Sequence, residues 1–313
     1  MSYMYDTSEV TDALRTKGWF VLRNFIKTSS IDSNLIDFLY QSPIFKDGVI
    51  KDIPSFLMKN IRDRVESIVP NLASIMGLNI DKNNFEYCAI KIDESKDKPI
   101  LKTPFNIHSD PKVAPGGVLN WHLDHFSFYL HKDHINWLIC YLPIVKMRSD
   151  YANVAIVSDD VIKKLDPESH SLLTGRGAIR FRKVETDTVE WFKLRFSNDT
   201  VNIGDWYAID DYDDTSMGWK LKFDPEEHKV IPELCVGDLL IMRADVMHRT
   251  SDSRISRVSV RCDAIPKNAY RKRTLIGLIL LTLHYPFIGS KRAYALKSWL
   301  LWEWRKRLVL FSK

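Results

Sequence analysis

The sequence predicts a mainly β protein with flanking helices, in which short strands form a sandwich or barrel. Strand-like segments separated by turn residues occupy residues 86–265. Residues 1–85 instead carry apolar side chains at spacings of three and four, which is typical of helices. The strand-rich part also contains two histidines and an aspartate, and their spacing would allow the strands of a barrel to bring these three side chains together.

Single segments support both halves of this prediction. In the first 85 residues, two segments have helical periodicity: FIKTSSIDSNLIDFLYQS and FLMKNIRDRVESIVPNLASIMG. Further along, the segments interpreted as strands include FEYCAIKI, INWLICYLPIV, NVAIVS, GAIRFRKV, TVEWFKLRF and DLLIMRA. We therefore expect one domain over residues 1–265, with helical support at 1–85 and a β core at 86–265. A C-terminal extension follows at 266–313.

The composition is that of a globular protein in a reducing compartment. The chain has 313 residues, of which 45% are hydrophobic, enough for a substantial core. Its first residues are polar and have no apolar core, so no signal peptide is expected. The four cysteines lack C-x-x-C spacing, which favours buried thiols over a zinc or redox site. We expect a cytoplasmic protein, and the sequence contains none of the glycine motifs of phosphate or dinucleotide binding.

The most informative motif is the triplet His122-Leu-Asp124, together with the distant His248. If residues 121–130 form a strand, His122 and Asp124 point to the same face, because side chains alternate along a strand. The third ligand must then come from another strand, so a long gap is expected. Two histidines and one carboxylate are the ligand set of facial-triad Fe(II) sites, which leave metal positions open for other ligands.

A second H-x-D triplet, His108-Ser-Asp110, competes with the first. Its neighbours include two prolines and two glycines, which favour a loop without strand geometry, so His122 and Asp124 are preferred. His125 lies three residues after His122, so on a strand it would point to the opposite face and away from the metal. We assign His108, Asp110, Trp121 and His125 to the substrate entrance.

The segment after His248 contains a second polar pattern. Read as a strand, residues 255–263 carry small or apolar side chains on one face and polar ones on the other. The polar face consists of Arg257, Ser259, Arg261 and Asp263. Two interpretations remain open. This face is either exposed to water on a half-buried strand, or it lies inside a barrel, where an arginine would pair with an anionic ligand.

These motifs together resemble the Fe(II)- and 2-oxoglutarate-dependent dioxygenases, and more loosely their phytanoyl-CoA dioxygenase-like branch. In chain order, the matching pieces are GWFVLRNF (18–25), WHLDH (121–125), the Gly237-Asp238 turn, His248 and Arg257-Val-Ser259. The resemblance implies a double-stranded β-helix, or jelly roll. It also implies Fe(II) bound by His122, Asp124 and His248, with 2-oxoglutarate and O2 as cosubstrates. Arg257 and Ser259 would bind the far carboxylate of 2-oxoglutarate, with Arg261 as the rival.

The activity implied by this resemblance is hydroxylation of an unactivated C–H bond in a small-molecule substrate. Desaturation and ring formation are variants of the same chemistry. Family members that chlorinate lack the carboxylate ligand, so Asp124 argues against halogenation. Two alternatives are the same chemistry on a lipid at a membrane surface, and a non-catalytic metal-binding jelly-roll protein.

The C-terminal extension has an unusual composition. Residues 270–313 contain ten basic residues and one acidic residue, so the rest of the chain has a net charge of −4. An uncharged run at 274–290 is short for a spanning helix and contains Pro286, so we reject a transmembrane span. Peripheral contact with an anionic membrane is one hypothesis; packing on the body or a homo-oligomer interface is the other. No nucleic-acid-binding motif accompanies the basic residues.

Overall fold

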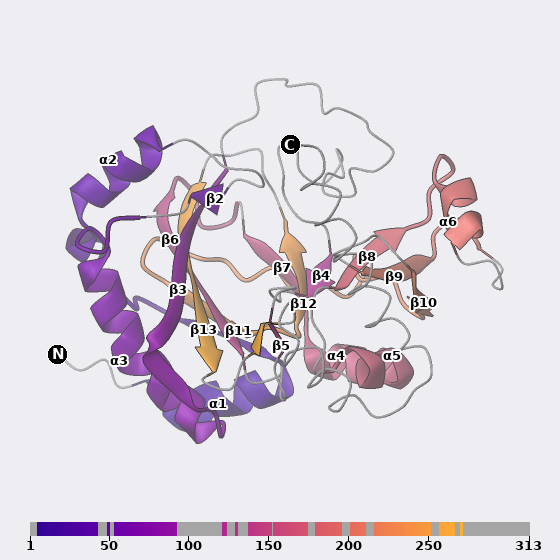
Figure 1. Cartoon of the computed structure of the whole chain (residues 1–313), viewed down its shortest axis with the longest axis horizontal. Coiled ribbons are helices and arrows are strands. Elements are labelled where there is room, and N and C mark those ends of the chain that lie inside the picture. Colours follow the sequence, from indigo (N-terminus) through magenta and orange to yellow (C-terminus); the bar gives the residue numbers. More distant parts are fainter. Residues whose placement is uncertain are drawn as a thin grey trace, which may run out of the picture.

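Two six-stranded antiparallel sheets form the centre of the molecule and pack face to face (Figure 1). The computed structural model describes residues 5–42, 49–50, 53–92, 121–123, 129–130, 137–151, 153–174, 179–195, 201–210, 216–251, 257–266 and 270–271. Sheet A has the order β1-β11-β6-β13-β3-β2, and sheet B the order β10-β9-β8-β4-β12-β7. A third, two-stranded sheet pairs β14 with β5.

The strands differ in length between the sheets. The strands of sheet A are β1 (Trp19–Leu22), β2 (Val49–Ile50), β3 (Ile80–Ile92), β6 (Leu138–Lys146), β11 (Leu239–Arg243) and β13 (Arg257–Pro266). Those of sheet B are β4 (His122–Leu123), β7 (Val154–Val157), β8 (Ile179–Lys183), β9 (Trp206–Asp210), β10 (Ser216–Leu221) and β12 (Met247–Thr250). The remaining pair is β5 (Tyr129–Leu130) and β14 (Tyr270–Arg271).

The strand order is that of a jelly roll. Along the chain, β3, β4, β6 and β7 alternate between sheets A and B, and β11, β12 and β13 do so again. Between the two series, Val230 forms a bridge with Ile156 of β7 and so occupies the remaining position of sheet B. Eight segments in this arrangement make a double-stranded β-helix, the fold that the resemblance implied. Strands β8 to β10 lie in an insertion between β7 and Val230 and extend sheet B.

Helices cover the outer faces of both sheets. They are α1 (Thr7–Thr16), α2 (Ser33–Gln41), α3 (Lys59–Ile75), α4 (Asp159–Leu165), α5 (Pro167–Leu173) and α6 (Val189–Arg195), with a 3-10 turn at Thr28–Ser30. Apolar residues of α1, α2 and α3 form one core with sheet A. A second core joins α4 and α5 to the outer face of sheet B, and a third fills the space between the sheets.

Local chemistry fixes how the N-terminal segment reaches sheet A. Asp6 caps α1 by accepting hydrogen bonds from the N–H groups of Ser8 and Glu9. Further along, Gly237 has a φ of 89°, and a Cβ there would lie 2.3 Å from the carbonyl oxygen of Ile26. Only glycine allows this close approach. The Gly237 turn therefore holds the chain after β1 against β11.

One predicted strand is wrong. The segment TVEWFKLRF contains helix α6, although its aromatic and β-branched residues favour a strand. The helix buries Phe192, and Val189, three residues earlier, packs into the same small cluster. That spacing matches one face of a helix. The strand-rich region also contains α4 and α5, which the sequence interpretation did not separate.

Other predictions fall partly outside the described residues. Within the segment predicted as one strand, 121–130, the structure describes β4 and β5, and residues 124–128 lie outside its description. Of the C-terminal extension, only residue 266 and the two residues of β14 are described. Among the described helices, none has the length and apolar character needed to span a bilayer.

Candidate metal and anion site

A pair of histidines lies on the inner face of sheet B. His122 of β4 and His248 of β12 are directly opposite each other in the antiparallel ladder, and their ring centroids are 4.3 Å apart. Both side chains are buried. Their neighbours Leu123 and Met247 point the other way, into the core beneath α4 and α5. Strand pairing therefore brings together two predicted ligands from opposite ends of the β core.

The backbone orients the ring of His248. Its Nδ1 lies 2.9 Å from the carbonyl oxygen of Val246. A carbonyl only accepts, so the neutral ring carries its proton on Nδ1 and its lone pair on Nε2. Histidines that bind metals are commonly oriented in this way, with the second nitrogen donating to a backbone oxygen. The donor chemistry of this pair therefore suits a divalent transition metal.

Several predicted site residues cannot be placed. Asp124, His108, Asp110 and His125 lie outside the described residues. The described part of the chain contains no group of three or more histidine, cysteine or acidic side chains placed so that they could hold a metal ion. The histidine pair is thus the part of the predicted triad that the structure describes, and Asp124 would be the residue that completes it.

Trp121 points away from the histidine pair. It is fully buried in the core on the outer face of sheet B, opposite in direction to His122. Its indole N–H donates to Glu226 at 2.6 Å. The prediction grouped Trp121 with nearby polar residues, whereas strand alternation places adjacent residues on opposite faces. The position of Trp121 gives no support to its entrance assignment, which stays a prediction.

Arg257 lies at the start of β13, and its face of the strand points between the sheets. The alternate residues Val258, Val260 and Cys262 pack in the core with the helices. Arg257 is 5% exposed, and burial lowers the pKa of its guanidinium to about 10, although Tyr141 nearby acts in the opposite direction. This dehydrated cation would be stabilised by an anion. Of the two interpretations of this polar face, the structure supports the interior one.

Thr250 connects the arginine to the histidine pair. It follows His248 by two residues on β12, so both side chains share the inner face. The guanidinium of Arg257 approaches the Thr250 hydroxyl at 3.5 Å. Ser259, two residues after Arg257, is buried on the same face of β13. Thr250 was missed in the sequence, although its position two residues after His248 would have predicted that both side chains lie on the same face of the strand.

Arg261 has a different role from Arg257. Its guanidinium pairs with Asp263, with Nε at 3.0 and 3.1 Å from the two carboxylate oxygens and Nη2 at 2.9 Å from one of them. The carboxylate of Asp263 is almost fully buried. A buried carboxylate needs this cation, so Arg261 is already engaged by a group of its own strand. This geometry favours Arg257 over its rival.

A second cation lies opposite Arg257. Lys146 of β6 pairs with Arg257 in the ladder between β6 and β13. Burial and the charge of Arg257 lower the pKa of Lys146 to about 8, while Cys235, Asp238 and Asp150 act the other way. Its ammonium donates to the Ser149 and Leu234 carbonyls and to the Asn153 side chain. No sequence pattern pointed to Lys146, because its pairing with Arg257 depends on the register of the sheet.

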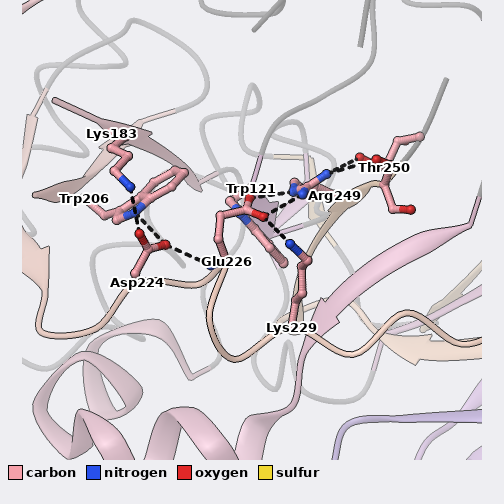
Figure 2. A network of polar contacts seen from close by, with 9 residues as sticks. Trp121, Lys183, Trp206, Asp224, Glu226, Lys229, Arg249 and Thr250 are labelled. Carbon is pink, nitrogen blue, oxygen red and sulfur yellow. Dashed lines mark hydrogen bonds and ion pairs between the residues drawn. The ribbon is translucent and has the colours of Figure 1, made fainter. Parts of the chain in front are cut away.

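Behind the histidines, on the outer face of sheet B, a polar network surrounds Glu226 (Figure 2). Glu226 accepts hydrogen bonds from Trp121, Lys229 and Arg249, and the Arg249 contacts are 2.9 Å from Nε and 2.7 Å from Nη2. Burial alone would raise the pKa of Glu226, but the hydrogen bonds from Arg249 and Lys229 outweigh it and lower the pKa to about 2. Glu226 is therefore ionised at neutral pH.

Comparisons with known proteins give structural likenesses only. No protein-family model matches the chain, and no curated protein matches its sequence. Similar solved structures include SnoN, a non-heme α-ketoglutarate-dependent epimerase from nogalamycin biosynthesis. The likeness has 13% identity and a TM-score of 0.48, covering 85% of this chain and 83% of that one.

Two further structures are similar at the same level. A prolyl-4-hydroxylase from Pseudomonas putida is 11% identical, with a TM-score of 0.45 over 84% of this chain and all of that one. HygX from Streptomyces hygroscopicus, solved with nickel and 2-oxoglutarate bound, is 12% identical, with a TM-score of 0.41 over 83% and 87% of the two chains. At such identities and TM-scores these likenesses do not identify an activity for the chain.

Proposed function

We propose that this protein is an Fe(II)- and 2-oxoglutarate-dependent oxygenase that acts on a C–H bond of a small molecule. The supporting observation is the arrangement between the sheets. A buried histidine pair on sheet B lies on the same strand face as Thr250, and Thr250 contacts a buried arginine on sheet A. A metal site and an anion site this close together would fit a dicarboxylate that chelates the metal at one end and meets a cation at the other.

Each side chain has a defined role in this proposal. His122 and His248 would bind Fe(II) together with Asp124, and the hydrogen bond from Nδ1 of His248 to Val246 leaves Nε2 as the atom that would bind the metal. Arg257 and Ser259 bind the far carboxylate of 2-oxoglutarate, and the charge of Lys146 adds to the attraction. Bound Fe(II) would supply the activation of O2, with 2-oxoglutarate oxidised to succinate and CO2 as the substrate is oxidised.

The outcome proposed for the substrate is hydroxylation, and the phytanoyl-CoA dioxygenase-like branch is the proposed placement within this class. The buried setting suits an oxidation that must exclude bulk water. His122, His248, Arg257 and Ser259 are each less than a tenth exposed, so the reaction would be shielded from bulk water. A carboxylate at position 124 would occupy the position that a halide needs, so halogenation is not part of the proposal.

An anaerobic titration tests the proposal. Fe(II)-loaded protein is titrated with 2-oxoglutarate, and the visible charge-transfer band of the chelate is followed in the wild type, Arg257→Ala and Arg261→Lys. We expect a band in all three, with Arg257→Ala needing at least about tenfold more 2-oxoglutarate, since it loses hydrogen bonds from a charged donor. Arg261→Lys is the matched control, because lysine retains a charge beside Asp263. A folded wild type that binds metal yet gives no band would contradict the proposal.

A further inference from the structure

Glu226 connects the two strands that carry the histidines, from the opposite face of the sheet. Its carboxylate binds Trp121, the residue before His122, and Arg249, the residue after His248. Arg249 and Trp121 also contact each other, with the guanidinium 5.2 Å from the ring centroid. Figure 2 shows the three side chains converging on one point. One carboxylate thus joins both strands directly behind the histidine pair.

The described pairing between the two histidine strands is short. Within the residues that the structure describes, β4 contains two residues, and its ladder with β12 consists of two residue pairs, Leu123 with Met247 and His122 with His248. Side-chain contacts across the same strands add to these backbone contacts in setting the spacing of the two imidazoles. A charged, bidentate Arg–carboxylate contact with an additional indole donor adds a rigid link across the same two strands.

Glu226 comes from a loop of the insertion rather than from either strand. The backbone N–H of Glu226 donates to Asp224 at 2.9 Å, and Lys229 pairs with its carboxylate at 2.7 Å. The loop is therefore itself held in place. We infer that Glu226 is a positioning residue that fixes the His122–His248 pair through Trp121 and Arg249. The effect of Glu226 on metal binding rests on the proposed function. Its effect on the geometry of the histidine pair does not.

The chain offers a matched control in the same loop. Asp224 accepts from the indole N–H of Trp206 at 3.1 Å and from Lys183 at 2.7 Å. It thus links β9 to β8 in the way that Glu226 links β12 to β4, but neither of those strands carries a predicted ligand. Asp224→Asn keeps the oxygen that accepts from the Glu226 N–H. Glu226→Gln and Asp224→Asn are therefore equivalent changes, one behind the histidines and one away from them.

The first test uses metal-free protein with labelled histidines. Nuclear Overhauser contacts between the rings of His122 and His248 are measured in the wild type, Glu226→Gln and Asp224→Asn. We expect the contact to lose at least half its intensity in Glu226→Gln and to persist in Asp224→Asn. The same intensity in all three would overturn the inference. If Glu226→Gln does not fold, Trp121→Phe removes one donor to Glu226, with Trp206→Phe as its control.

The second test measures Co²⁺ binding by absorption, which requires no turnover. We expect Glu226→Gln to weaken Co²⁺ binding about tenfold, the lower end of what outer-shell changes cost, and Asp224→Asn to change it less than twofold. Equal weakening in both variants would indicate a general loss of stability and overturn the inference. If the wild type shows the ring contact but binds no Co²⁺, the proposed function fails, and the ring contacts alone decide the role of Glu226.

Discussion

Sheet A and sheet B hold their strands together by different means. Sheet A contains the three longest described strands, β3, β6 and β13, and its outer face packs with three helices into one large apolar core. The described strands of sheet B have six residues or fewer, and side-chain carboxylates such as Glu226 and Asp224 link neighbouring strands across its outer face. The proposed anion site lies on sheet A and the histidine pair on sheet B. Stability and ligand geometry should therefore respond to different substitutions.

The largest effect on stability is expected in the core of sheet A. Leu72 of α3 is buried in that core, and Leu72→Ala should cost about 2–5 kcal/mol, because the cavity is only partly filled by relaxation. Chemical denaturation measures the loss, and Leu72→Met serves as the volume-conserving control. Co²⁺ affinity should stay within twofold of the wild type. A parallel loss of Co²⁺ affinity would show that the core of sheet A also controls the histidine pair on sheet B.

A smaller but substantial effect is expected at Arg261. Arg261→Met leaves the carboxylate of Asp263 buried without its cation and should cost about 3 kcal/mol. Adding Asp263→Leu should recover most of that loss, which denaturation of the double variant would measure. The titration with 2-oxoglutarate should be unchanged. If Arg261→Met instead needs much more 2-oxoglutarate, then Arg261, rather than Arg257, binds the far carboxylate of 2-oxoglutarate.

On sheet B, the contribution of Glu226 to stability should depend on pH in the acid range. The pKa of Glu226 is lowered in the folded state, to about 2 from an ordinary 4.5, so its ionisation stabilises the folded protein above about pH 4.5. That stabilisation is lost as the pH falls toward 2. The difference in unfolding free energy between the wild type and Glu226→Gln should therefore shrink as the pH falls from 5. A difference independent of pH would mean that the charge of Glu226 contributes nothing.

The smallest effect is expected on the solvent-facing side of α3. Lys59 and Asp63 form an exposed ion pair one helical turn apart. Lys59→Ala should change the stability by less than about 0.5 kcal/mol, because water screens such pairs. Thermal unfolding at low and high salt would measure it. A larger loss would indicate that the helical layer depends on charge as well as on apolar burial.

The sequence predicted those features that depend on local alternation. Parity alone assigned Arg257 and Ser259 to one face of β13, and the structure places that face between the sheets. Strand alternation also gave His122 its direction, and the same rule predicts that its neighbour Trp121 points to the opposite face, as the structure shows. For TVEWFKLRF, residue preferences favoured a strand, but burial of Phe192 on a short helix decided the outcome.

What the sequence could not predict depends on distant contacts. Glu226 lies 105 residues from Trp121, in a loop, and no motif connects them. Lys146 faces Arg257 through a register that includes an irregularity after Val258. Such pairings are set by how the sheets assemble, and a local pattern contains no information about them.

The insertion that extends sheet B has the form of an exchangeable module. Its two ends meet at Ile156 and Val230, whose backbone groups donate to each other's carbonyl oxygen at 2.8 Å. Segments that leave and rejoin a fold at one point can be lengthened or replaced with little cost to the rest. Here, however, the module also supplies Glu226. A replacement, whether by evolution or by design, would have to bring its own carboxylate to the back of the histidine strands.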